Sequence, residues 1–231
     1  MPAFSSYSTS TTSANSTHYR SSTFTPRARD LLVAVGAFSG TVLAAPLVQT
    51  TNQPLWSNFA YVTSARWATS ANSLYCYVAT GLASSVPTTI VWDLTGDAGT
   101  GGAMWCGSMD SMTRISIDAV RQRAVLLNQP ASTIPSTVFA ASTLTANPIL
   151  AFCGVNSTTP TLTAPAGYTE VADQGYGAPS TGIWVGFRNS GTTSTQVLWQ
   201  TQSSLSLWGS GAVEFNALER ELFMGTICDT Y

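Results

Sequence analysis

The sequence predicts an all-β protein: an antiparallel two-sheet sandwich, jelly-roll-like in outline, with an extended N-terminal arm. Three observations predict it. Short segments rich in Val, Ile, Thr and aromatic residues recur between turn residues, proline is spread along the chain, and no window of helical length carries an apolar stripe. The 231 residues suit one large β-domain or two small ones, and 44% of them are hydrophobic, which is enough for a substantial core.

The N-terminal arm covers residues 1–25, a low-complexity segment dominated by Ser and Thr. Such a segment has little to bury and is expected to be flexible. One interpretation is a frayed terminus. The other is an arm that becomes ordered against a neighbouring subunit, and its partner-binding candidates are Tyr7, His18, Tyr19, Arg20 and Phe24.

The β-sandwich is expected over residues 26–218, with a C-terminal tail at 219–231. Its first candidate strands have β-branched and aromatic compositions and turn residues at their ends. They are Leu31–Phe38, Phe59–Trp67, Leu74–Ala79, Thr88–Leu94 and Ala103–Ser108. Short helical turns are compatible with the sequence only within 112–127 and 217–224.

An internal repeat predicts that the sandwich consists of two halves, at about 29–110 and 147–216, joined by a long linker at about 110–147 that contains Ser, Thr and Pro. Residues 74–79 match 183–188, 89–92 match 196–199, and 102–106 match 211–215; corresponding residues lie 109, 107 and 109 positions apart. The segment 31–36 also resembles 149–154. Four matches in the same order predict a duplication. We favour one sandwich with a single core, because a half of this size buries little surface alone. The alternative is two tandem small domains.

Charge and hydropathy exclude two classes of partner. Only 9% of residues are charged, and nine arginines against eleven acids leave a net charge of −2, so nucleic-acid binding is not expected. The apolar run at 31–38 follows Asp30, contains Gly36 and is followed by Ser39, Gly40 and Thr41. It therefore predicts a buried strand rather than an export signal or a membrane span.

Catalytic chemistry has few candidate residues. The sole histidine, His18, lies in the arm, and the chain lacks a G-x-S-x-G motif, so nucleophilic catalysis is not expected. A glycosidase-type carboxylate pair is the one catalytic route left open. Its candidates are Asp93, Asp97, Asp110, Asp118, Glu170, Asp173 and Glu214. The loop at 93–102 lacks calcium-loop and phosphate-loop spacing, so we predict no catalytic residue, cofactor or metal site.

The cysteines are expected to be reduced residues of the core. Cys76, Cys106 and Cys153 lie in apolar segments, and with Cys228 they form no C-x-x-C motif. Free cysteine in such a segment behaves as a small buried hydrophobe. Two disulfides remain the alternative for a secreted protein.

Several segments resemble the strands of β-sandwich virion proteins of tailed bacteriophages. The similar segments are 25–35, 166–173 and 182–215, and together the resemblance covers most of residues 25–218. It consists of strand patterns rather than of a signature motif. The resemblance implies an accessory, non-enzymatic protein that decorates or cements a capsid, binding the major capsid protein and copies of itself, with a trimer as the expected oligomer. It implies no functional residues.

The expected function is therefore that of a capsid cement or decoration protein at the virion surface. Low charge and many Ser, Thr and aromatic residues suit broad protein interfaces. The alternative is a tail or fibre protein, or a secreted module that binds cell-surface glycans. Five of the seven tryptophans lie within candidate strands, so the glycan alternative depends on Trp56 and Trp208, which are placed beside turns.

Overall fold

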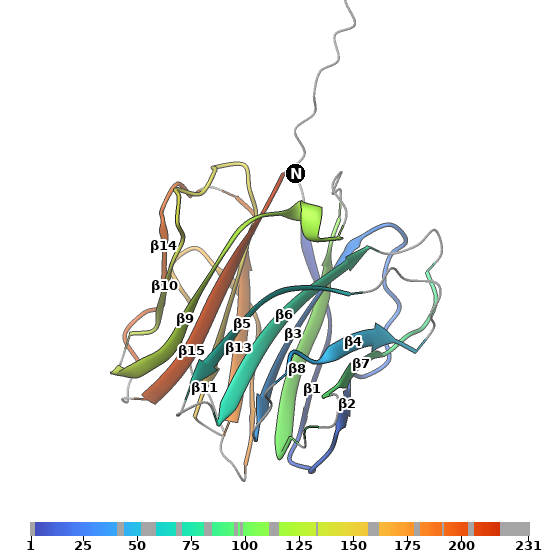
Figure 1. Cartoon of the computed structure of the whole chain (residues 1–231). Coiled ribbons are helices and arrows are strands. Elements are labelled where there is room, and N and C mark those ends of the chain that lie inside the picture. Colours follow the sequence, from blue (N-terminus) through green and yellow to red (C-terminus); the bar gives the residue numbers. More distant parts are fainter. Residues whose placement is uncertain are drawn as a thin grey trace, which may run out of the picture.

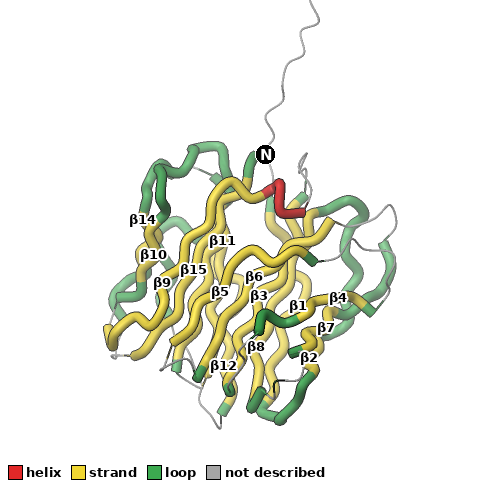
Figure 2. The backbone as a smooth tube through the Cα atoms, in the orientation of Figure 1, coloured by secondary structure: helices red, strands yellow, loops and turns green. Residues whose placement is uncertain are grey.

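The computed structural model describes residues 3–40, 44–51, 59–67, 71–80, 85–94, 97, 99–110, 116–132, 134–156, 162–177, 181–190, 192–202 and 206–217. Strands make up most of these residues, and the one helical segment among them is a 3₁₀ turn, η1 (Ser116–Ala119), drawn in red in Figure 2. The all-β prediction is confirmed. The predicted tail at 219–231 lies outside the described residues.

Two five-stranded antiparallel sheets form the sandwich. The N-terminal sheet has the order β1 (Phe4–Thr12), β8 (Gly101–Met109), β3 (Leu31–Ser39), β6 (Asn72–Thr80), β5 (Ala60–Trp67). The C-terminal sheet has the order β12 (Thr169–Tyr176), β13 (Thr181–Arg188), β11 (Ile149–Val155), β15 (Ser206–Phe215), β9 (Val120–Ser132). The two sheets share one core, to which both halves of the chain contribute, as Val33 and Phe152 illustrate.

A small outer layer covers the far face of each sheet, so that the molecule has four layers (Figure 1). The N-terminal outer layer has the strands β2 (His18–Arg20), β7 (Ile90–Asp93) and β4 (Leu47–Thr50). The C-terminal outer layer has β10 (Ser136–Val138) and β14 (Gln196–Leu198). Central strands are therefore covered on both faces: Leu31 and Val33 of β3 face the shared core, while Leu32 and Ala34 face the outer layer.

The five candidate strands of the first half are confirmed as β3, β5, β6, β7 and β8. Two strands between the halves were not predicted: β9 and β10 lie in the segment 110–147, which the sequence indicates as a linker. The first positions of β9 read Val-Arg-Gln-Arg and are not fully buried. An edge strand of that kind lacks the apolar pattern by which the other strands were recognised.

The predicted flexible arm also differs from the structure. Among its described residues, Phe4–Thr12 pair with β8 as an edge strand, His18–Arg20 pair with β7, and Phe24 forms a bridge with Thr88. A segment rich in Ser and Thr can occupy a sheet edge, because hydroxyl side chains tolerate solvent on one side. Residues 4–24 are therefore part of the sandwich and do not extend from it.

The two halves have corresponding strand orders. When β1, β8, β3, β6 and β5 are matched in turn to β9, β15, β11, β13 and β12, the N-terminal sheet reproduces the C-terminal sheet. In the outer layers, β2 and β7 correspond to β10 and β14, whereas β4 has no counterpart among the described strands. This order supports the predicted duplication, which stays a prediction.

A β-bulge lies at the same relative place in each half. The pairing of β5 with β6 shifts register at Val62, and the pairing of β12 with β13 shifts at Val171. The two valines are 109 positions apart, and so are Asn72 and Thr181, the first residues of β6 and β13. The Thr181 hydroxyl donates a hydrogen bond of 3.2 Å to Asn72 Oδ1. Bulges are features that related sheets retain.

Reciprocal contacts cross between the two sheets. At the end of β5, Trp67 donates its Nε1–H to Asn156 Oδ1 at 2.8 Å, just beyond β11. At the end of β12, Tyr176 donates its hydroxyl to Ser39 Oγ at 2.8 Å, at the end of β3. Each sheet thus donates an aromatic side chain to the end of the other sheet's central strand.

Two of the residue matches in the predicted repeat are out of register. Leu31 was matched to Ile149, yet Leu31 faces the shared core and Ile149 faces the C-terminal outer layer. Likewise, Ala103 faces the shared core and its match Ala212 faces the outer layer. Both faces of these strands are apolar, so the sequence pattern contains no alternation that could have fixed the register.

Candidate functional site

Large exposed apolar side chains gather around the C-terminal outer layer. Val138 on β10 is 61% exposed and Leu198 on the paired strand β14 is 47% exposed, and both lie on the outward face of the layer. The other members are Leu126 of β9, Ile134 before β10, and Leu144 after β10. We refer to these five residues as the outer-layer surface. Elsewhere, Leu47, Tyr61 and Ile117 are the described large apolar residues with comparable exposure.

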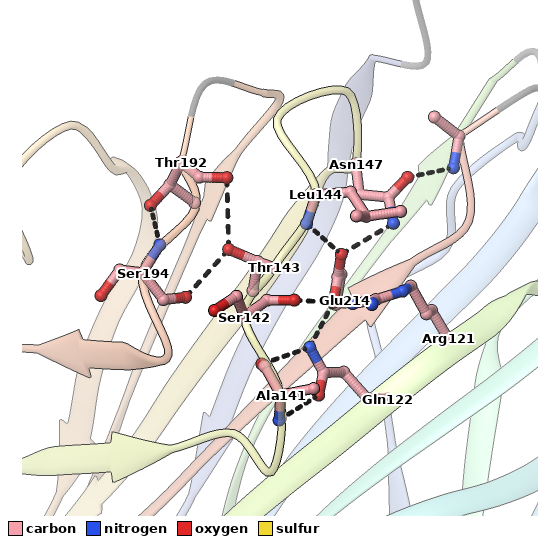
Figure 3. Close-up of polar contacts among 11 residues, drawn as sticks. Arg121, Gln122, Ala141, Ser142, Thr143, Leu144, Asn147, Thr192, Ser194 and Glu214 are labelled. Atoms are coloured by element: carbon pink, nitrogen blue, oxygen red, sulfur yellow. Dashed lines mark hydrogen bonds and ion pairs between the residues drawn. The ribbon is translucent and has the colours of Figure 1, made fainter.

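A buried carboxylate fixes the chain beneath this surface. Glu214 on β15 is fully buried, and its Oε1 accepts hydrogen bonds from the Leu144 N–H at 2.8 Å and from Asn147 Nδ2 at 2.7 Å (Figure 3). Its Oε2 accepts hydrogen bonds from Arg121 and Gln122 of β9. Four donors therefore satisfy a charge that would otherwise be costly to bury.

The segment that follows β10 is held at a second place as well. The Thr143 hydroxyl contacts the carbonyl oxygens of Thr192 and Ser194 at 3.2 and 2.9 Å, just before β14 (Figure 3). The exposed Leu144 is thus displayed from a segment bound on one side to the sheet and on the other to the outer layer. The arrangement presents an ordered apolar surface rather than a loose loop.

The N-terminal half has a smaller buried polar group at the corresponding place. The Ser108 hydroxyl on β8 donates a hydrogen bond to Asp30 Oδ2 at 2.7 Å, and the Tyr7 hydroxyl oxygen of β1 lies 2.8 Å from Ser108 Oγ. Asp30 comes directly before β3, as Asn147 comes just before β11. In the N-terminal half the buried acid, Asp30, lies beside the central strand β3. In the C-terminal half the buried acid, Glu214, lies on β15, the neighbour of the central strand β11.

Of the seven candidate carboxylates, the structure brings Glu170 and Asp173 together on β12. Glu214 serves as the anchor described above, and the others lie apart. Asp93 is 3.5 Å from His18, Asp110 accepts a hydrogen bond from the Ala3 N–H, Asp97 accepts one from the Ala44 N–H, and Asp118 is exposed in η1.

The two carboxylates on β12 lie beside buried tryptophan. Glu170 Oε2 accepts a hydrogen bond of 2.9 Å from Trp184 Nε1, and Trp184 packs edge-on against Trp199. Asp173 Oδ1 is fully buried without a hydrogen-bond partner among the described residues. Burial raises the pKa of Asp173 to about 7, and the negative charge of Glu170 adds to the rise. Both tryptophans are almost wholly buried, so neither offers a face on which a sugar ring could stack.

The predicted partner-binding residues divide into two groups. Tyr7, Tyr19 and Phe24 are used within the chain: Tyr19 and Phe24 are core residues, and Tyr7 stacks on Phe24. His18 and Arg20 are exposed on β2. Binding of a neighbouring subunit by these residues stays a prediction.

The burial of the described tryptophans weakens the glycan-binding alternative. The sequence places Trp208 beside a turn, but it lies within β15 and is 2% exposed, so that placement is wrong and Trp208 is not available to a glycan. Trp56 lies outside the described residues. The described tryptophans are all core residues, which leaves the glycan alternative without a placed aromatic platform.

The remaining titratable groups offer little chemistry. Cys76, Cys106 and Cys153 are free and buried, as predicted, while Cys228 lies outside the described residues. Burial raises the pKa of the Cys106 thiol to about 12. Among the described residues, no group of three or more His, Cys, Asp and Glu side chains could hold a metal ion. No helix in that part of the chain is long and apolar enough to cross a membrane.

Comparison with known proteins adds no relative. No protein-family model matches the chain, and no curated protein or solved structure is significantly similar to it.

Proposed function

We propose that this protein is a non-enzymatic structural component of a virus particle, which decorates or cements the capsid by binding the major capsid protein and copies of itself. The concentration of exposed apolar side chains around the C-terminal outer layer carries the proposal. A cement protein acts by burying surface against partners and needs no titratable group or cofactor. The resemblance to β-sandwich virion proteins of tailed bacteriophages supplies the class of partner.

The anchoring of the outer-layer surface supports the proposal. Residues such as Leu144 and Val138 stand on segments fixed by buried hydrogen bonds, so binding a partner would cost little ordering of the backbone. Interfaces are depleted in charged residues at their centre, and only 9% of this chain is charged.

The copy number of the protein in purified particles from its source tests this proposal. Quantitative mass spectrometry against the major shell protein is the measurement. A copy number comparable to that of the shell protein is the expected result. A much smaller number would replace decoration with the tail or fibre alternative, and absence from the particles would contradict the proposal and favour the secreted glycan-binding alternative.

A further inference from the structure

The β-bulge in β12 places two carboxylates on one face of the strand. In a regular strand, residues three positions apart point to opposite faces. The bulge at Val171 changes this alternation: Glu170 pairs with Gly186 and Asp173 pairs with Trp184, two residues away on β13. Glu170 and Asp173 therefore lie on the same outward face, like residues two positions apart, about 7 Å along the strand.

In the N-terminal half, the side chains at the two corresponding places are in contact. The equivalent bulge at Val62 puts Tyr61 and Ser64 on one face of β5, and their hydroxyl oxygens are 2.8 Å apart. Tyr61 and Ser64 are the counterparts of Glu170 and Asp173 at the shared offset of 109 positions. The two corresponding places therefore have neutral groups in one half and acids in the other.

Among the described residues, the groups that act on the Asp173 carboxyl come from its own strand and from the segment 162–168. Glu170 on its own strand is the charged group that acts on it, and from the segment 162–168 the backbone N–H of Leu162 donates to it. From β13, Trp184 donates to Glu170, while Arg188 is bound to the carbonyl oxygens of Ala166 and Ser190. The remaining titratable group of that segment, Tyr168, faces Arg188.

The segment 162–168 lies beside Asp173 on the outward face of the sheet. Leu162 belongs to the core beneath the outer layer, and Ala164 and Tyr168 pack against that core. The Thr163 N–H donates to Gln202 Oε1 at 3.0 Å, on the chain that leaves β14. Asp173 therefore joins the edge strand β12 to the segment that connects it with the outer layer.

We propose that Asp173 holds a proton in the folded protein and that the loss of this proton, beside the acid Glu170, loosens the contact between β12 and residues 162–168, so that this edge of the sandwich responds to pH. When the proton is held, the pair has a single negative charge, which Trp184 stabilises by its hydrogen bond to Glu170. When it is lost, two carboxylates face each other and Asp173 Oδ1 is a buried charged atom without a hydrogen-bond partner among the described residues.

The sign of the pH effect follows from the raised pKa of Asp173. Because the folded protein holds this proton up to about pH 7 and the unfolded chain releases it near the ordinary value of 3.8, stability decreases as pH rises between these two values. Once the pH is well above 7 the proton is lost in the folded protein too, and Asp173 causes no further change. This inference does not depend on the proposed function.

Urea unfolding of the full chain between about pH 4.5 and 8.5, for the wild type and for Asp173→Asn, tests the proposal. We expect the unfolding equilibrium constant of the wild type, relative to that of the variant, to increase several-fold from about pH 5 to 7.5 and then to stay constant. Glu170→Gln, which removes the neighbouring charge, should move this increase to lower pH. Asp118→Asn, which changes an exposed acid in η1, is the matched control and should leave the wild-type profile unchanged.

A carboxyl ¹³C NMR titration of the folded wild type gives a second test that requires no variant. A side-chain carboxyl assigned to Asp173 that titrates near neutrality agrees with the proposal. Parallel stability profiles for the wild type and Asp173→Asn would overturn it, as would an Asp173 carboxyl that titrates in the ordinary acidic range.

Discussion

The two halves of this molecule place different side chains on corresponding frames. The sheets have matching strand orders, and β5 and β12 have bulges at Val62 and Val171. At corresponding positions, however, the N-terminal half has the hydroxyl pair of Tyr61 and Ser64, whereas the C-terminal half has Glu170 and Asp173. The comparison teaches that the frame depends on apolar alternation and strand register, while the polar residues on it are free to differ.

The buried acids illustrate the same freedom. Asp30 in the N-terminal half is satisfied by hydroxyl groups, whereas Glu214 in the C-terminal half is satisfied by Arg121 and three neutral donors. The C-terminal version holds the segment that displays Leu144, so a buried charge there has a structural task that Asp30 does not share. Among the residues that the structure describes, most of the large exposed apolar ones belong to the half with the charged anchor.

The largest expected effect comes from deleting residues 1–24, which removes β1 and β2. Phe4, Tyr19 and Phe24 are core residues, and burial of each aromatic side chain stabilises a fold by about 1.5–3 kcal/mol. Their loss, with an unpaired β8 edge, approaches the whole stability of a typical domain. We expect no cooperative thermal unfolding transition in the truncated chain by circular dichroism. A truncated chain that melts like the full one would show that the segment is an arm after all.

The second effect concerns the two buried acids. Glu214→Ala leaves Arg121, Asn147 and the Leu144 N–H without their acceptor, and we expect it to lower the free energy of unfolding by about 3–5 kcal/mol. Asp30→Ala leaves only neutral hydroxyl groups without their acceptor, and we expect it to lower the free energy of unfolding by about 1–3 kcal/mol. Urea unfolding measures both variants. Equal losses would contradict the distinction between the two halves.

Much of the fold could be predicted from the sequence because its central strands are covered on both faces. Segments such as Leu31–Phe38 and Ala103–Ser108 consist mostly of apolar residues and lie between turn residues. Edge strands were harder to predict: the Ser/Thr-rich β1 reads as a disordered arm, and β9 reads as a linker. Their pairing partners lie far away in the sequence, so no local pattern indicates them.

The candidate sites depended on geometry that the sequence does not express. Glu170 and Asp173 are three positions apart, a spacing that puts side chains on opposite faces of a regular strand, and only the bulge at Val171 reverses this. Val138 and Leu198 belong to three-residue strands, too short for a periodic pattern. The burial of Trp208 was likewise hidden, because the glycines beside it in the sequence read as a turn.

The smallest expected effect is the difference between the two halves in the rate at which their buried thiols become exposed, and we expect this difference to be zero. Cys76 and Cys106 lie in the N-terminal sheet and Cys153 in the C-terminal sheet, and all three thiols are buried. Because the sheets share one core, we expect them to unfold together and to expose the three thiols at the same rate. Pulsed alkylation with peptide mass spectrometry measures this. Faster labelling of either half would indicate separate unfolding units and favour tandem domains.

Binding by the outer-layer surface tests the central claim most directly. The double variant Val138→Ser/Leu198→Ser should change stability by only about 0.5 kcal/mol per site, because both side chains are exposed. The matched control is Leu47→Ser, at a residue 54% exposed on the opposite outer layer. The measurement is the occupancy of particles stripped of the protein after incubation with each variant. We predict loss of occupancy for the double variant and wild-type occupancy for Leu47→Ser; undiminished occupancy by the double variant would contradict the account.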